Sequence, residues 1–312
     1  MRRDRRHRPA SDHVAHRHAV HGLLPDGVGL GFRRLDGWRK NRRCERPARK
    51  GLPTTAARSF RIGRCDPMRK ERKRINERGL AMLTQQELLD FFEGSAGTYR
   101  FLSQVFFKEL NEQAIEELAL GEYPSETGNA HLDEGYRLVR RYLAFSANDR
   151  RTQLACEYAR IFLAAGVFTK DRQTAVPYES VFAGDERIMM GDARDDVVAR
   201  FLEDGFQVNP DLHEPEDHLA FELEYLANMN ERAREQAQAR NRDQLRRNVV
   251  RQQEFIEGHL LSWIPLLHET SLDYAKLTFY PGMLLVAQGT LEQARDLLRG
   301  VLAQLDGATA AA

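Results

Sequence analysis

Three side chains in the second half of the chain have types and spacing that suggest a metal site. His218 and Glu222 stand four residues apart, so a helix places them on one face, and His213 lies just upstream. A metal-dependent hydrolase centred on these three residues is therefore one alternative. The set is incomplete, because a zinc helix of the HExxH kind supplies two histidines on one face and this segment has one. We predict no bound metal and expect a carboxylate to hydrogen-bond His218 near the start of a helix.

The candidate nucleophiles lack the surroundings that activate such groups. Neither Cys156 nor Ser180 lies in a nucleophile elbow or an oxyanion loop. Cys156 stands between Leu154 and Tyr158 and is predicted to be a small core residue. No GxxxxGK[ST] phosphate loop is present. The sequence thus predicts a protein that is not an enzyme and that holds no cofactor.

The net charge of +1 hides two segments of opposite charge. Residues 1–81 hold 24 Lys and Arg against 8 Asp and Glu, a balance of +16, whereas residues 82–312 hold 23 against 38, a balance of −15. Such asymmetry indicates a tail whose physical behaviour differs from that of the folded part. An acidic folded part attracts basic segments and disfavours nucleic acid.

The basic segment, residues 1–81, is predicted to be disordered. Its arginines are scattered among Pro, Gly and five of the ten histidines, with too little apolar content to offset the entropy of ordering. We interpret it foremost as an upstream reading-frame extension from a mis-assigned start. A transit peptide and a nucleic-acid-binding tail are the alternatives. Arg33-Arg34 is a twin arginine, but the Leu-Asp-Gly-Trp-Arg that follows it is not the apolar run of an export signal.

Residues 82–312 carry helix signals from end to end. Thr84 and Glu87 form a capping-box pattern, Asp149 is a plausible N-cap, and Gly205 is a natural terminator. Gly94–Gly97 is predicted to break or kink the first helix. Sustained strand alternation is absent, so we predict a single all-α globular bundle of about eight to eleven helices.

Further boundaries are predicted in the second half of this part. A helix begins near Glu214, with Pro215 in its first turn and Glu216 and Asp217 beside the positive end of its dipole. Pro265 is expected to break a later helix. Thr290 is expected to start the last one.

Residues 214–226, EPEDHLAFELEYL, are the most informative stretch. They combine an acidic patch with large apolar neighbours: Glu214, Glu216, Asp217, Glu222 and Glu224 beside Leu219, Phe221, Leu223 and Tyr225. Such a surface suits a peptide that has both positive charge and an apolar run. The plainer interpretation is an amphipathic helix with a solvated acidic side.

Four segments carry a further pattern, in this order: Glu157–Phe162 (EYARIF), Pro177–Phe182 (PYESVF), Glu214–Leu223 (EPEDHLAFEL) and His259–Pro265 (HLLSWIP). They closely resemble the TorD/DmsD family of chaperones that mature molybdenum-containing redox enzymes. Together they span the chain from about Met82 to the last helix. The 81 residues before it are a departure from the family pattern.

The resemblance implies an all-α, TorD-like fold and a cytoplasmic chaperone. Such a protein binds the twin-arginine leader, and the body, of an apo molybdenum oxidoreductase and holds it until cofactor insertion, before export. Carried over by position, Asp217 and His218 are the first candidates for leader contact and Glu222 a weaker one. Tyr178, Glu179 and Ser180 are expected to line the same cleft or to pack it.

Three further expectations accompany the resemblance. A NarJ-like chaperone for a non-exported enzyme subunit is a close alternative function. Monomers and homodimers are both open. Because no apolar run approaches the length of a membrane span, no stable membrane insertion is expected.

Overall fold

The structure is a computed structural model that describes residues 32–34, 83–145, 149–165, 174–184 and 187–307. Its elements in chain order are β1 (Phe32–Arg34), α2 (Gln85–Phe107), α3 (Glu112–Ala119), α4 (Ala130–Phe145), α5 (Arg150–Phe162), α6 (Ser180–Ala183), α7 (Asp192–Glu203), β2 (Phe206–Val208), the 3₁₀-helix η1 (Pro210–Leu212), α8 (Leu219–Gln238), α9 (Arg242–Phe255), the π-helix η2 (Ile256–Leu260), α10 (Leu261–Leu272) and α11 (Phe279–Gly307). The predicted all-α class is confirmed.

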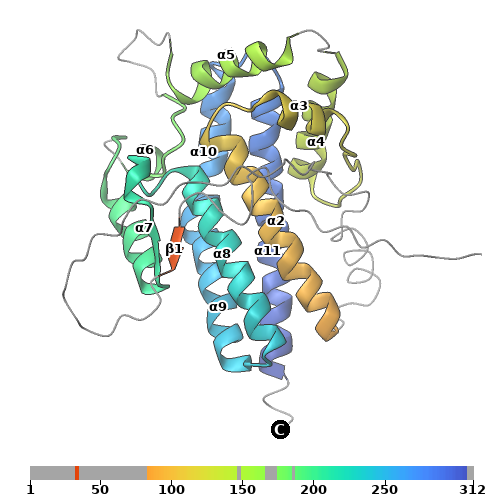
Figure 1. The fold of residues 1–312 in the computed structure, drawn as a ribbon, viewed down its shortest axis with the longest axis vertical. Coiled ribbons are helices and arrows are strands. Elements are labelled where there is room, and N and C mark those ends of the chain that lie inside the picture. The colour runs from red at the N-terminus through yellow and green to blue at the C-terminus, as the bar shows by residue number, and fades with distance from the viewer. Residues whose placement is uncertain (1–31, 35–82, 146–148, 166–173, 185–186, 308–312) are drawn as a thin grey trace, which may run out of the picture.

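Four long helices form the body of the molecule. Figure 1 shows α2, α8, α9 and α11 running lengthwise beside one another, with α3, α4 and α5 around one end and α6 and α7 on a flank. The contacts between α2 and α8 and between α4 and α11 are the most extensive. The start of α8 is bonded to the segment that leads into α6, because the Leu219 N–H donates to the Pro177 carbonyl.

The helix α2 begins as the sequence predicts and continues past the expected break. Thr84 and Glu87 form the capping box, with the Thr84 side chain accepting from the Glu87 N–H. The break predicted at Gly94–Gly97 is wrong, because α2 runs unbroken from Gln85 to Phe107. Small residues there pack closely inside the molecule, where Ser95 and Ala96 are buried, and this burial outweighs the helix-propensity cost of glycine.

The start of α8 differs from the prediction. The helix begins at Leu219 with His218 as its N-cap, so the predicted start near Glu214 is wrong. Backbone bonds to a distant loop hold the preceding residues out of the helix: the Glu179 N–H donates to the Asp217 carbonyl at 3.0 Å, and the Leu219 N–H donates to the Pro177 carbonyl at 2.9 Å. Tertiary bonding here overrides the local helix signal.

Two helices in the last third also run through predicted boundaries. Pro265 lies inside α10, which begins directly after the π-helical turn η2, so the break expected at this proline is wrong. The start expected at Thr290 for the last helix is also wrong, because α11 starts at Phe279 and runs through Thr290. Pro and capping-type residues can occupy helix interiors where packing against neighbours decides the backbone path.

The contact between α4 and α11 needs glycine. A Cβ on Gly135 would lie 2.7 Å from the Gly282 carbonyl oxygen, and one on Gly289 would lie 2.6 Å from the Leu132 N. The two backbones approach more closely than side chains allow.

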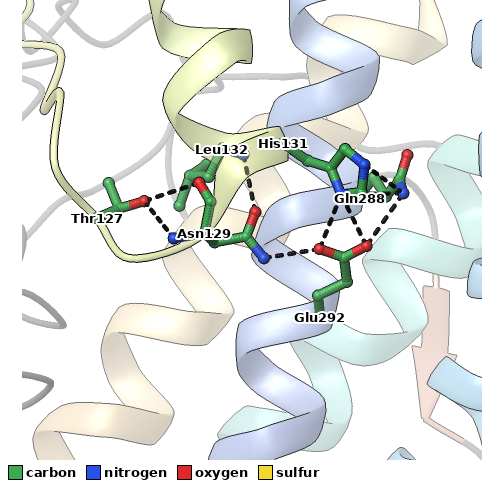
Figure 2. A network of polar contacts seen from close by, with 6 residues as sticks. All are labelled: Thr127, Asn129, His131, Leu132, Gln288 and Glu292. Atoms are coloured by element: carbon green, nitrogen blue, oxygen red, sulfur yellow. Dashed lines mark hydrogen bonds and ion pairs between the residues drawn. The ribbon is translucent and has the colours of Figure 1, made fainter. Parts of the chain in front are cut away.

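A polar network closes this contact at the start of α4 (Figure 2). Asn129 accepts from the Leu132 N–H at 2.9 Å and donates to Glu292 at 2.6 Å. His131 and Gln288 also contact the Glu292 carboxylate, at 2.9 Å and 3.0 Å. We call these residues, Asn129, His131, Gln288 and Glu292, the α4–α11 network.

Two local features complete the fold. The strand β1 pairs antiparallel with β2, with Arg33 opposite Gln207. The other residues of segment 1–81, for which the sequence predicts disorder, lie outside the described residues.

Cys156 is exposed, so the predicted core position is wrong. It stands two residues from both Leu154 and Tyr158, and a helix turns by about 200° over two residues, which places it on the opposite face.

Candidate functional site

Three of the four family-like segments meet at the start of α8. The loop that carries Tyr178 forms an isolated antiparallel bridge with His218. Side-chain contacts join the same segments, since Glu179 contacts His259 of η2 and Trp263 of α10 donates to Glu222 of α8. Phe182 of α6 stacks on Trp263 of α10 with ring centroids 5.8 Å apart. We call Glu179, Ser180, Asp217, His218, Glu222, His259 and Trp263 the α8-start cluster.

Asp217 fastens the loop to the helix start. Its Oδ2 accepts from the Ser180 N–H at 2.9 Å, while its Oδ1 is buried with no hydrogen-bond partner among the described residues. Burial raises the pKa of this carboxyl, which its hydrogen bonds from Ser180 and the charge of Arg194 only partly oppose. The side chain is fully buried. Asp217 is therefore a carboxyl group held under the loop and short of donors.

Glu222 has an even less favourable environment. It is fully buried, and Trp263 Nε1 donates to its Oε2 at 3.3 Å, while no N–H or O–H group of another described residue donates to its Oε1. The Glu222 carboxyl also shares a hydrogen bond with that of Glu179. Burial raises the pKa of Glu222 well above its ordinary value, and the nearby charges of Glu179 and Asp217 raise it further. The charged form of Glu222 is therefore disfavoured, because neighbouring carboxylates repel one another in so small a space.

Glu179 links this group to the π-helical turn. Its Oε2 lies 3.0 Å from His259 Nδ1, and the His259 ring stacks on Phe255 with centroids 4.6 Å apart. π-turns frequently occur at functional sites. Here the turn brings His259 against a buried carboxylate.

His218 caps α8 in its neutral form. Its Nδ1 accepts from the Ala220 N–H at 3.0 Å, so the carboxylate partner expected from the sequence is not what holds it. Tyr178 and Phe221 pack around the ring, with centroids 5.0 and 5.8 Å away. Burial lowers the pKa of His218 to about 3. A protonated ring would lose the lone pair that caps the helix.

The acidic patch of the sequence divides into a buried set and an exposed rim. Asp217, Glu222 and Glu224 are buried, so these three residues do not form the solvated acidic side that the sequence left open. Glu224 lies 3.5 Å from Arg100 of α2. At the surface, Tyr178 donates to the exposed Glu214 at 2.7 Å, and Glu216 pairs with Arg194 at 2.7 Å. Glu214 and Glu216 form what we call the acidic rim.

The remaining family-like segment serves another part of the fold. Glu157 of α5 accepts from the backbone N–H groups of Lys276 and Leu277, at 2.6 and 2.7 Å, and pairs with Arg160. It thereby fixes the turn between α10 and α11. Glu157 is therefore structural and lies outside the α8-start cluster.

Comparisons with known proteins agree with this arrangement. A family model described as the nitrate reductase delta subunit matches residues 129–269, which include all three converging segments. The chain is 30% identical over 207 residues to the chaperone protein TorD of Vibrio vulnificus (strain YJ016), covering 62% of this chain and 90% of that protein. It is 29% identical over 219 residues to chaperone protein TorD of Vibrio cholerae (strain M66-2), covering 68% and 96%. For chaperone protein TorD of Salmonella paratyphi B, identity is 25% over 217 residues.

The chain belongs to the TorD chaperone family. Membership confirms the predicted resemblance and the prediction that the protein is not an enzyme. The metal-dependent hydrolase is thereby excluded, and the geometry agrees: His218 caps a helix and Glu222 bonds to Trp263. Within the described residues, no group of three or more His, Cys, Asp or Glu is placed to hold a metal ion.

The structure adds two members that the candidate site lacked. His259 and Trp263 contact Glu179 and Glu222, respectively. Both stand in the HLLSWIP segment, so the family-like motif itself was the available signal. Sequence separation hid the contact, because Glu179 and His259 are 80 positions apart in the chain.

Among the described helices of this TorD-family chain, none combines the length and the hydrophobicity that crossing a lipid bilayer requires.

Proposed function

We propose that this protein is a cytoplasmic maturation chaperone that binds the twin-arginine leader of an apo molybdenum-containing oxidoreductase until its cofactor is inserted. The observation that carries the proposal is the α8-start cluster: buried carboxyl groups that are short of donors, beneath a loop with an acidic rim. Membership of the TorD chaperone family supports it. Guanidinium groups supply the fixed fork of donors that such carboxylates lack.

The burial of the cluster assigns different tasks to its members. The acidic rim and Tyr178 are accessible and would meet the leader's arginines first. Asp217 lies beneath the loop and is bonded to Ser180 within it, and Glu179 of the loop is buried as well. These residues would either hold the loop in place or accept an arginine when it opens. His218 keeps the start of α8 in position, and Glu222 supplies the second unsatisfied carboxyl group.

Binding of a synthetic leader tests the proposal. The probe is a fluorescent peptide of about 25 residues with two consecutive arginines followed by an apolar run, and the control carries glutamines in place of the arginines. We expect full-length protein to bind the arginine peptide at least about tenfold more tightly in an anisotropy titration, a difference that high salt reduces. Equal affinity for both peptides would contradict the proposal.

A variant of the cluster tests the assigned residue. Asp217→Asn removes the charge but keeps the shape, and we expect it to weaken binding of the arginine peptide by more than about tenfold, with helix content by circular dichroism unchanged. The matched control is Asp296→Asn, an exposed aspartate on α11. If Asp217→Asn binds as tightly as the wild type, Asp217 is not part of the site.

The NarJ-like alternative has one observation in its favour, which is the description of the matching family model as the nitrate reductase delta subunit. A chaperone for a non-exported subunit has no need of paired arginines. The same titration separates the two functions, because the alternative predicts that replacing the arginines leaves affinity unchanged.

A further inference from the structure

Three consecutive apolar residues are exposed between α6 and α7. Ile188, Met189 and Met190 are 54%, 45% and 60% exposed. Single exposed apolar residues are ordinary, but a run of three on a loop marks an interaction surface or an aggregation hazard. We call these residues the apolar triplet.

The backbone holds the triplet outward at a conformational cost. Arg187 and Met190 have φ angles of 51° and 63°, in the left-handed region that side chains other than glycine rarely adopt. Such strain persists only when surrounding contacts impose it, and it concentrates at binding and switch segments. One of those contacts is the Met190 N–H, which donates to Ser180 Oγ at 3.1 Å.

This contact joins the triplet to the α8-start cluster. The Ser180 that accepts from Met190 also donates its own N–H to Asp217. One residue further on, the Gly191 carbonyl accepts from the Arg194 N–H at 3.0 Å, and the Arg194 guanidinium pairs with Glu216 of the acidic rim. The apolar triplet and the acidic rim are therefore two parts of one surface, connected through residues 190–194.

Charge on this surface indicates the occupant. Beside the triplet, α7 opens with the exposed Asp192, Asp195 and Asp196, and the acidic rim lies on the other side of Arg194. An apolar patch bordered by carboxylates suits a segment that is basic at one end and apolar at the other. A wholly apolar partner would leave the carboxylates without counter-charge.

We propose that the apolar triplet receives the apolar run of such a peptide while the acidic rim receives its arginines. The proposal rests on the proposed leader binding and adds the surface that selects for the apolar run. Methionine suits this task, because its flexible, polarisable side chain packs against apolar sequences of varied shape. Selection would then depend on hydrophobicity rather than on an exact sequence.

Oxidative footprinting of the full-length protein tests the contact directly. Hydrogen peroxide converts accessible methionines to sulfoxides, and mass spectrometry measures each rate. The probe is a leader peptide whose two arginines are followed by an apolar run of leucines, the arginine–leucine peptide. Met189 and Met190 should oxidise quickly in the free protein, and a saturating concentration of this peptide should slow their oxidation by at least about fivefold. Met229 and Met283 are buried and serve as internal controls, with slow rates in both states.

A matched variant pair tests the energetic contribution. Met189→Gln with Met190→Gln should weaken binding of the arginine–leucine peptide by about tenfold, but leave unchanged the weaker binding of a peptide with serines in place of the leucines. The control is Leu120→Gln, which changes an apolar side chain that is 86% exposed at the end of α3. Its affinity for both peptides should equal that of the wild type.

The outcomes separate this inference from the function on which it rests. If the arginine peptides bind but neither protection nor the loss in the double variant is seen, the triplet is not the apolar subsite and the leader-binding proposal stands. If no arginine peptide binds, both proposals fail. Protection that grows with protein concentration without peptide, together with a doubled mass by light scattering, would assign the triplet to a second copy of the chain and overturn the inference.

Discussion

The α4–α11 network and the α8-start cluster each surround a glutamate, but they treat it in opposite ways. Glu292 receives contacts from Asn129, His131 and Gln288 (Figure 2). Glu222 shares its pocket with Glu179 and Asp217, and among the described residues it has one donor, Trp263. Burial alone would raise the pKa of Glu292, but hydrogen bonds from its three neighbours outweigh it and lower the pKa. For Glu222, burial and neighbouring charge act together and raise it.

The comparison shows how one fold separates stability from binding. Satisfied polar groups stabilise a contact between helices, whereas unsatisfied buried ones weaken the folded state unless a ligand supplies their partners. Titratable groups with strongly shifted pKa values gather at functional sites for this reason. The α4–α11 network needs nothing further, while the α8-start cluster lacks the donors that a guanidinium group provides.

The largest effect concerns His218 in acid. The folded state holds the pKa of His218 near 3, below its ordinary value of 6.5, so the stability that its neutral form provides is present above pH 6.5 and is lost as pH falls toward 3. Between pH 7 and pH 4 the wild type should lose about 3 kcal/mol more stability than His218→Asn, whose amide also caps a helix but does not titrate. Urea unfolding at each pH measures the difference.

The paired design removes the contribution of other titrating groups, since both proteins share them. His218→Asn also shortens a packed ring, so its stability at pH 7 is expected to be lower. If the unfolding free energies of the two proteins fell in parallel with pH, protonation of His218 would cost no stability and the prediction would be wrong.

A smaller loss is expected when the α4–α11 network is broken. Glu292→Gln replaces a charged acceptor of several hydrogen bonds by a neutral amide, and should cost about 2 kcal/mol of unfolding free energy at pH 7. The control is again Asp296→Asn, whose side chain is exposed and pairs only with exposed or half-exposed arginines among the described residues. Equal urea midpoints for the two variants would refute the assignment of the network as a stabilising contact.

The sequence predicted the locally determined parts of the fold and missed those that distant contacts decide. Thr84 and Asp149 cap their helices as expected, because a cap needs only residues within one turn. The start of α8 was misplaced, since loop residues near position 178 hold residues 214–217 out of the helix.

The site was partly predictable for the same reason. Motif resemblance identified Glu179, Asp217 and Glu222 as candidates, and the structure brings them together. Periodicity could not show that Glu222 and Glu224 are buried, because the first half of α8, residues 219–227, is buried on all faces. His259 comes from the π-helical turn η2 and Trp263 from the start of α10, and the position of both depends on the packing of α9 and α10.

The smallest effect on stability should have the opposite sign. Glu222→Gln preserves the acceptor for Trp263 and adds an N–H₂ group that can donate to Glu179, so it should stabilise the protein by about 1 kcal/mol at pH 8. Because the raised pKa makes the wild type lose stability as pH rises through it, the gain should be greater at pH 8 than at pH 5. Urea midpoints at the two pH values measure both quantities.

The same variant also tests binding. If the leader's arginines donate to Glu222, Glu222→Gln should bind the arginine peptide less tightly while it unfolds at a higher urea concentration. A stabilised variant with wild-type affinity would instead make Glu222 a core residue alone, and the contrast with Glu292 would then concern packing rather than function.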